Sequence, residues 1–207
     1  MTRILFPEIY LLRHGKTLWN SQGRLQGQLD SALLESSYDA LHAIDALFEE
    51  IECTHHFCSP IGRVGSSISV MGKLRLAEWA KKDALMEISC GKYEGRLITE
   101  IPDCFIEERN RNPWETRWPE GESFSDVHNR TQSFIESLQY LKGPVCIFGH
   151  ETVNRVLIGH LLGLDPKIVT GLKHPNEVVF RIHQGVLDWV SVGHSWVKSS
   201  AISKISK

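Results

Sequence analysis

The sequence predicts an α/β protein with three layers (αβα), in which helices cover both faces of a mostly parallel sheet. Short apolar runs rich in β-forming residues occur at residues 8–12, 55–58 and 145–148 and predict buried strands. Segments with apolar residues at spacings of three and four separate them, a pattern typical of amphipathic helices. Two strand-like runs, 177–183 and 186–192, are separated only by Gln184-Gly185 and predict an antiparallel hairpin near the end of the chain.

The helical periodicity identifies where the sheet is covered. The segments concerned are residues 35–51, 62–71, 123–141 and 152–162. The third has the clearest boundaries, because Ser123-x-x-Asp126 resembles a capping box and Gly143-Pro144 cannot continue a helix. Residues 96–122 are polar and contain three prolines, and we expect a partly helical excursion that covers the site. No repeats are present, and a length of 207 residues suits a single domain over 1–207.

Composition narrows the functional class. A net charge of -2 and a pI near 6.5 argue against binding to nucleic acid or a membrane surface through bulk charge. No apolar run of about eighteen residues predicts a membrane span, and the apolar part of the N-terminus is too short for a signal peptide. The five cysteines form no Cys-x-x-Cys pair, which predicts reduced thiols in a cytoplasmic protein. The oligomeric state stays open.

Two histidines follow predicted strands and mark the candidate site. The first strand runs into Arg13-His14-Gly15, and the strand at 145–148 runs into Gly149-His150. In open α/β sheets, ligands bind beyond the carboxyl ends of the strands. Arginine offers a planar set of donors suited to phosphate, histidine can act as a nucleophile at neutral pH, and Gly15 would allow the backbone to approach an anion. The pattern therefore predicts an anion site that contains a nucleophile.

Beyond these residues, the chain resembles the histidine phosphatase superfamily, the phosphoglycerate-mutase-like group, and its phosphatase branch in particular. The matching motifs are Leu12-Arg13-His14-Gly15-Lys16-Thr17-Leu18-Trp19-Asn20, Gln26-Gly27-x-x-Asp30, Ser59-Pro60-x-x-Arg63, Glu87-x-x-x-Gly91-x-x-Glu94-Gly95, Pro119-x-Gly121-Glu122-Ser123, and Gly149-His150 with Arg155 and Leu161-Leu162-Gly163-Leu164. They occur in the family's order over residues 8–164. The resemblance implies a phosphoglycerate-mutase-like fold.

The resemblance also implies roles for the two histidines. His14 would attack the phosphorus and become a phosphohistidine, while Arg13, Arg63 and His150 would surround the phosphoryl oxygens. Such an arrangement suits phosphoryl transfer, which depends mainly on positioning and on stabilisation of negative charge. Covalent catalysis at His14 would divide hydrolysis into two displacements.

Matching the remaining motifs assigns the other site residues. Glu87 would donate a proton to the leaving oxygen, with Glu94 as the competing candidate that instead suits a turn. Asn20, Gln26 and the backbone amide of Gly27 would bind the phosphate or the substrate.

Two residues depart from the family pattern. Lys16 replaces the common Glu or Gln, and it either tunes substrate choice or only faces solvent. Glu151 follows His150 where Gly is common. If its backbone amide binds phosphate, its side chain can point away, whereas a side chain that points in would repel the anion.

We expect neither a metal nor a cofactor. His150-Glu151-x-x-Asn154 is close to the metalloprotease pattern His-Glu-x-x-His, but Asn154 replaces the second ligand. The resemblance therefore favours a metal-independent phosphomonoesterase whose partner is a small phosphorylated substrate. The alternative is a phosphoglycerate-type mutase, although mutases of this family are usually longer and carry Glu-Arg-His-Tyr-Gly where this chain has Glu87-Ile-Ser-Cys-Gly91. A non-catalytic phospho-ligand binder is the third possibility, and fold analogy does not identify the substrate.

Overall fold

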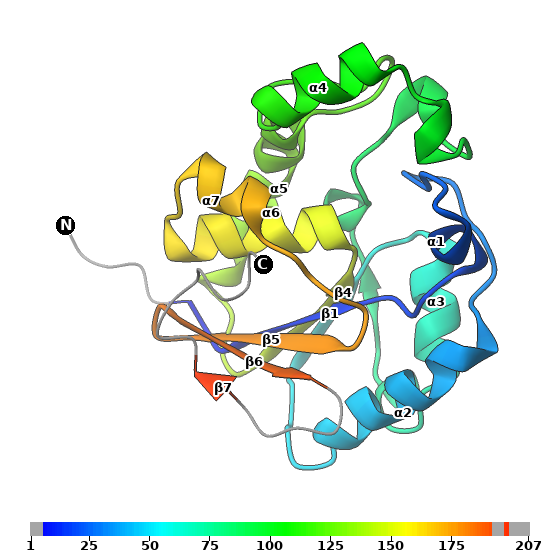
Figure 1. The fold of residues 1–207 in the computed structure, drawn as a ribbon. Coiled ribbons are helices and arrows are strands. Elements are labelled where there is room, and N and C mark those ends of the chain that lie inside the picture. Colours follow the sequence, from blue (N-terminus) through cyan, green and yellow to red (C-terminus); the bar gives the residue numbers. More distant parts are fainter. Residues whose placement is uncertain (1–5, 192–196, 199–207) are drawn as a thin grey trace.

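A seven-stranded sheet forms the centre of the molecule (Figure 1) in the computed structural model, which describes residues 6–191 and 197–198. The strands are β1 Ile9–Arg13, β2 His55–Cys58, β3 Ala80–Lys81, β4 Val145–Gly149, β5 Val178–His183, β6 Val186–Ser191 and β7 Val197–Lys198, in the spatial order β3-β2-β4-β1-β5-β6-β7. Strands β3, β2, β4 and β1 are parallel to one another, and β5, β6 and β7 extend the sheet by antiparallel pairing. The predicted fold class is confirmed.

Helices cover both faces of this sheet. They are α1 Leu18–Gln22, α2 Tyr38–Leu47, α3 Gly62–Ser69, α4 Asp103–Arg111, α5 Phe124–Leu138, α6 Glu151–Leu162 and α7 Pro166–Gly171. Figure 1 shows α5 and α6 on one face and α2 and α3 on the other, with α4 at the top, away from the sheet. Helix α4 belongs to the predicted excursion, whose partly helical character is thereby confirmed. Within the described residues, no helix has the length and apolarity needed to cross a membrane.

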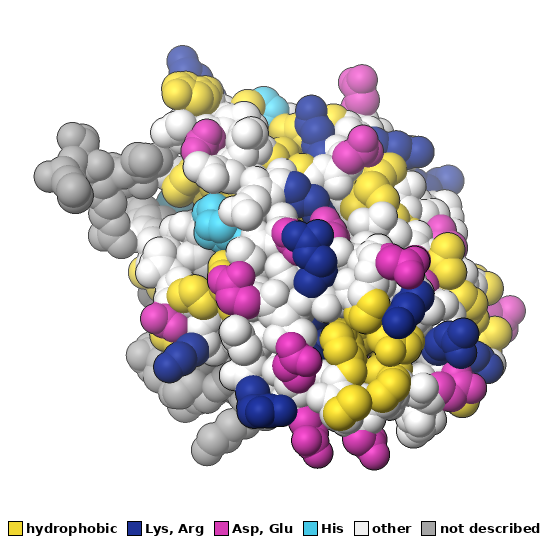
Figure 2. Space-filling view, turned by 90° about the horizontal axis from the view of Figure 1, so that it is seen from above, with side chains coloured by type: hydrophobic (Ala, Val, Ile, Leu, Met, Phe, Trp, Pro, Cys, Tyr) yellow, Lys and Arg dark blue, Asp and Glu magenta, His cyan; other side chains and the backbone are white. Residues whose placement is uncertain are grey.

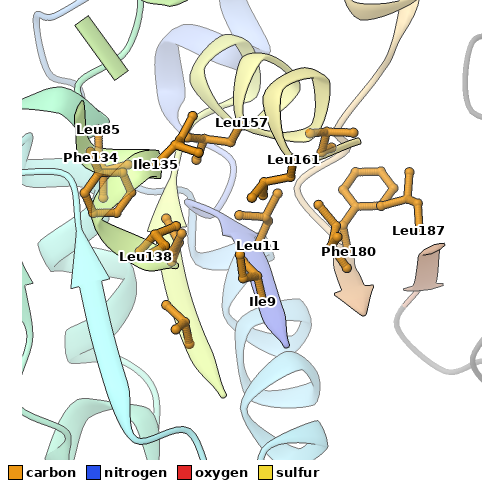
Figure 3. Packing of buried hydrophobic residues seen from close by; sticks show 14 of the residues in the cluster. Ile9, Leu11, Leu85, Phe134, Ile135, Leu138, Leu157, Leu161, Phe180 and Leu187 are labelled. Atoms are coloured by element: carbon orange, nitrogen blue, oxygen red, sulfur yellow. The ribbon is translucent and has the colours of Figure 1, made fainter. Parts of the chain in front are cut away.

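Alternation along β1 explains the two cores. Ile9 and Leu11 pack with residues of α5 and α6, as Figure 3 shows, whereas Tyr10 and Leu12 belong to the cluster formed with α2 and α3. Successive side chains of a strand point to opposite faces, so a strand buried on both faces has to be apolar throughout. A third cluster includes Trp118 and joins the excursion to α5 and α6.

Several local predictions differ from the structure at element ends. The helix expected over 35–51 begins with a 3-10 turn at residues 35–37, and α2 follows it. Helix α7 was not predicted, although Asp165 caps it and Pro166 occupies its first turn, both ordinary start signals. Helix α1 was also missed, and it starts at a capping box between Thr17 and Asn20. The predicted end of the last strand, Val192, and the tail 199–207 lie outside the described residues.

Candidate active site

The register of the central strands brings the two histidines together. Strands β1 and β4 are parallel neighbours with Arg13 opposite Gly149, so His14 and His150 both emerge at the carboxyl edge of the sheet. Their ring centroids are 5.2 Å apart, and both side chains are buried. The predicted juxtaposition thus follows from two strands ending at the same level.

Hydrogen bonds fix the tautomer of His14. Nδ1 lies 2.8 Å from the carbonyl oxygen of Gly15, and Nε of Arg63 donates to Nε2 at 3.1 Å. Both contacts require the hydrogen on Nδ1 and a lone pair on Nε2. Burial, followed by the positive charges of Arg63 and Arg13, lowers the pKa of His14 well below its usual value of 6.5. The ring is therefore neutral at physiological pH, with its lone pair directed at the arginine.

Gly15 packs closely against neighbouring side chains. A Cβ at this position would come within 2.9 Å of Leu41 Cδ1 and of Ser37 Oγ. Its backbone amide donates to Ser67 Oγ at 2.9 Å. Close packing against Ser37 and against Leu41 of α2 leaves little room for a side chain at this position.

Arg63 is held in place by a loop. It lies in the first turn of α3 and donates from Nη1 to the carbonyl of Leu29 at 2.7 Å and from Nη2 to the carbonyl of Gly27 at 2.9 Å. Its backbone amide donates to Asp30 Oδ1 at 2.9 Å. Burial lowers its pKa, yet an arginine keeps its charge. The loop thus positions a permanent cation beside the His14 lone pair.

Arg13 shares its charge with Glu151. Its Nη1 donates to the carbonyl of His174 at 2.6 Å and lies 2.9 Å from Glu151 Oε2. The other oxygen of Glu151 is 3.9 Å from Arg155 Nη1, and Glu151 lines the same cavity as His14. Of the two orientations considered for Glu151, the structure shows the one in which the side chain points toward the site.

The two candidate acids differ in their surroundings. Glu87 lines the cavity, and its carboxylate accepts hydrogen bonds from the amides of Thr152, at the start of α6, and of Ile88, at 3.2 and 2.9 Å. Glu94 accepts from the hydroxyl of Ser89 at 3.1 Å and from two backbone amides at 3.0 Å. Glu94 also lies outside the cavity lining, so the geometry favours Glu87 as the acid.

The remaining predicted residues are placed as follows. Asn20, Gln26 and Gly27 line the cavity. Asn20 also accepts from the amide and hydroxyl of Thr17 at 3.1 and 3.0 Å, so its oxygen serves the cap of α1. Gly27 has a φ of 53°, and its carbonyl holds Arg63. Lys16 is exposed and lies outside the cavity lining, which agrees with the solvent-facing alternative.

Other contributors come from parts of the chain that the sequence did not single out. The carbonyl of His174 holds Arg13, and Asn176 Nδ2 donates to the carbonyl of His14 at 2.6 Å. A backbone acceptor carries no sequence signal, so the His174 contact could not be predicted. His150 Nε2 lies 2.8 Å from Ser59 Oγ, whereas its Nδ1 is buried with no partner among the described residues.

The excursion forms part of the wall of the cavity, which has a volume of about 470 Å³. The excursion contributes Arg109 of α4 and Trp118 to this wall, beside Phe124 of α5 and Arg155 of α6. On the face seen in Figure 2, acidic and basic side chains are interspersed, and hydrophobic side chains gather in one region. In the described part of the chain, no group of three or more His, Cys, Asp or Glu side chains is arranged to hold a metal ion.

Asn154 has a structural role. Its Nδ2 donates to the carbonyl of Leu12 at 2.9 Å and lies 3.1 Å from His174 Nδ1. It thereby links α6 to β1 and to the segment before β5. The similarity of residues 150–154 to a metalloprotease motif has no counterpart in this geometry.

Comparison with known proteins agrees with the family resemblance of the sequence motifs. The family model of the histidine phosphatase superfamily (branch 1) matches residues 9–195. Proteins named "Probable phosphoglycerate mutase GpmB" are similar to this chain: the one from Erwinia tasmaniensis is 27% identical and the one from Yersinia pestis 29%, each over 94% of this chain and 92% of the relative.

Solved structures share the fold. The alpha-ribazole phosphatase from Shigella flexneri superimposes with a TM-score of 0.76 at 20% identity, covering 90% of this chain and 96% of the other. A mycobacterial glucosyl-3-phosphoglycerate phosphatase in complex with VO3 gives 0.72 at 21% identity, covering 93% and 97%. At these identities the structures establish the fold alone.

Proposed function

The chain belongs to the histidine phosphatase superfamily, branch 1, and we propose that it is a metal-independent phosphomonoesterase acting on a small phosphorylated metabolite. The observation that carries the proposal is the state of His14. It is a buried, neutral imidazole whose Nε2 lone pair meets a fixed cation, with Arg13 beside it. A nucleophile among permanent positive charges suits attack on a phosphoryl group.

The geometry supports two displacements. The phosphoryl oxygens give Arg63 Nε a new acceptor, which frees the His14 lone pair. Nε2 then forms a bond to phosphorus while the ester P–O bond breaks, and the leaving oxygen takes a proton from Glu87. Water next attacks the phosphohistidine, its P–N bond breaks, and Glu87 accepts a proton from that water. Inorganic phosphate leaves, and His14 returns to its neutral state.

Backbone contacts preorganise this chemistry. Gly15 O holds Nδ1–H, so the imidazole is already oriented, and carbonyls of residues 27 and 29 hold the guanidinium of Arg63. Preorganised groups reduce the reorganisation needed when charge develops in the transition state. His150 Nδ1, buried without a partner among the described residues, is a further candidate donor to a phosphoryl oxygen.

A phosphoglycerate-type mutase is the alternative, favoured by the names of the relatives at 27–29% identity. Mutase activity would require that the phosphohistidine return its phosphoryl group to a second oxygen of the substrate before water attacks. Interconversion of phosphoglycerates that depends on a bisphosphate primer separates it from hydrolysis.

Release of phosphate from an aryl phosphate in the presence of EDTA tests the proposal. We expect release by the wild-type protein, and loss of about three orders of magnitude or more in His14→Ala, because the covalent route is removed. His183→Ala is the matched control, since His183 is exposed on β5. EDTA-sensitive release would contradict the metal-independent mechanism, and no release from aryl phosphates or a metabolite panel would instead favour a non-catalytic binder.

A further inference from the structure

A pair of charged side chains outside the cavity holds the segment that carries Glu87. Residues 86–90 belong to neither a helix nor a strand, so no regular hydrogen-bond pattern fixes Glu87 in place. Arg130, in the middle of α5, and Glu122, the last residue of the excursion, form an ion pair with 2.8 Å between Nε and Oε1. Neither residue lines the cavity. An effect of the pair on the reaction therefore has to reach the cavity through Glu87 or through its charge.

The guanidinium of Arg130 binds three backbone carbonyls of this part of the chain. Its Nη1 donates to the carbonyl of Ala84 at 2.7 Å, and its Nη2 donates to those of Met86 and Glu87 at 2.7 and 3.2 Å. Its remaining nitrogen, Nε, donates to Glu122. A guanidinium presents five donors in one rigid plane, whereas the ammonium of a lysine is a single point of charge. The fork of Arg130 therefore fixes the backbone from Ala84 to Glu87 at three points.

Glu122 fixes the other end of the segment. Its Oε2 accepts from the amide of Ser89 at 2.9 Å, and its own amide donates to the carbonyl of Ser89 at 2.9 Å. Gly121 allows this close approach, because a Cβ there would lie 2.4 Å from the carbonyl oxygen of Ser89. The backbone is thus held before Glu87 by Arg130 and after it by Glu122. Because these two residues are also bound to each other, they form one clamp on residues 84–89.

The side chain of Glu87 depends on that backbone for its position. Its carboxylate accepts from the amides of Ile88 and Thr152, and among the described residues no side chain donates to it. Its direction toward the cavity therefore follows from where the backbone lies. A general acid has to be within hydrogen-bond reach of the leaving oxygen, and a displacement of about 1 Å costs about 100-fold in rate.

We propose that Glu122 and Arg130 are positioning residues for proton transfer, because their clamp on residues 84–89 holds Glu87 at the leaving oxygen. The proposal rests on the phosphatase function above, in which Glu87 protonates that oxygen as the P–O bond of the ester breaks. Neither positioning residue lines the cavity, so phosphoryl binding and the attack by His14 do not require the clamp. The cost of losing the clamp then depends on how strongly the leaving group needs a proton.

Aryl phosphates with different leaving groups test the clamp. Phenolate is a poor leaving group that needs a proton, whereas dinitrophenolate leaves readily as an anion, so only phenyl phosphate depends on the acid. In Arg130→Lys we expect kcat/KM, which covers the steps up to the phosphohistidine, to fall about 30- to 100-fold for phenyl phosphate and less than about threefold for dinitrophenyl phosphate. Glu87→Ala should show the same contrast with a larger fall.

Arg117→Lys is the matched control. Arg117 forms an ion pair with Asp126 near the start of α5, is exposed and lies outside the cavity, so both substrates should react as in the wild type. Lysine keeps the positive charge but not the planar fork. Wild-type activity of Arg130→Lys would therefore show that only the charge of Arg130 matters and would overturn the proposal, as would an equal fall for both substrates.

Amide hydrogen exchange, followed by NMR, reports the position of Glu87 without turnover. The amide of Thr152 lies in the first turn of α6, where it has no acceptor within the helix, and it donates to Glu87 instead. In Arg130→Lys its exchange should accelerate about tenfold or more, whereas the amide of Leu157, in the middle of α6, should keep its rate. Unchanged exchange at Thr152, or equal acceleration at both amides, would overturn the proposal. If the wild type hydrolyses neither phosphate while Thr152 responds as expected, the phosphatase function fails and the clamp on Glu87 stands.

Discussion

The carboxylate of Glu151 offsets part of the positive charge in the proposed phosphoryl pocket. Glu151 lies 2.9 Å from Arg13 Nη1 and also approaches Arg155, so it offsets positive charge that would otherwise face the phosphate. Its side chain is 27% exposed, and solvent therefore weakens this effect without removing it. We therefore expect a carboxylate at this position to reduce the affinity for phosphate, which would assist release of the product.

Glu151→Gln should tighten the binding of inorganic phosphate. Removing a negative charge beside Arg13 strengthens anion binding, and glutamine can still accept a hydrogen bond from the guanidinium. For a partly exposed pair we expect an increase in affinity of about three- to tenfold, measured by calorimetry at constant ionic strength. Glu136→Gln, an exposed residue of α5, should leave the affinity unchanged. Weaker binding in Glu151→Gln would show that the carboxylate mainly holds Arg13 in place.

The starts of helices place the functional groups. Arg63 is in the first turn of α3, and His150 is the N-cap of α6, where the amide of Thr152 holds Glu87. Helix α5 packs on α6 and begins at Ser123, whose hydroxyl accepts from the amide of Asp126 at 3.1 Å while the Asp126 carboxylate accepts from the amide of Ser123 at 2.7 Å. Arg63 and His150 are therefore both positioned by helix starts, and the capped helix α5 supports α6 by packing against it.

Ser123→Ala should reduce the free energy of unfolding by about 1 kcal/mol, the usual effect of losing an N-cap hydroxyl. The substitution leaves the amide of Asp126 without its side-chain acceptor at the start of α5. Urea unfolding followed by circular dichroism measures the change. Ser133→Ala, at an exposed position within the same helix, should change stability by less than about 0.5 kcal/mol. Equal effects of the two substitutions would contradict a specific role for the cap.

At the scale of the whole molecule, the layered fold buries three neutral histidines around the carboxyl edge of the sheet. Burial lowers the pKa of His14 and of His150 well below 6.5, and lowers that of His174 to about 3. His174 is satisfied as a neutral ring, since Asn154 Nδ2 lies 3.1 Å from Nδ1 and Nε2 lies 2.9 Å from the carbonyl of Val178. Protonation of these rings is therefore linked to unfolding.

Stability should fall as the pH is lowered through 6.5. Below that pH the unfolded chain binds protons at these histidines, whereas the folded protein does not until the pH approaches the lowered pKa, about 3 for His174. Each histidine contributes up to about 1.4 kcal/mol of lost stability per pH unit in this window. Urea unfolding between pH 7.5 and pH 5 measures the slope.

His174→Gln should be less stable at pH 7.5 but should show a shallower dependence on pH. His183→Ala, which removes an exposed histidine, should keep the wild-type slope. A wild-type stability that stays constant between pH 7 and pH 5 would contradict the linkage.

Local sequence patterns were sufficient to predict the main helices and strands and the motifs that contain His14 and His150. Three features depend only on neighbouring residues in the chain: the apolar runs that bury both faces of β1 and β4, the cap of α5, and the position of His14 and His150 after strands. The structure agrees with each of them. Helices α1 and α7 were missed because they are five and six residues long, too short to show a periodicity.

By itself, the sequence determined the α/β class, the family motifs and the residues that carry the proposed chemistry, because each is encoded in residue types at fixed short spacings. Only the tertiary structure decided that Glu151 points toward Arg13, that the carbonyl of His174 holds that arginine, and that Arg109 lines the cavity without a carboxylate partner among the described residues. The physical reason is that the direction of a side chain and the balance of its charge depend on partners far away in sequence. Those partners meet only when the strands take their register and the excursion packs beside the cavity.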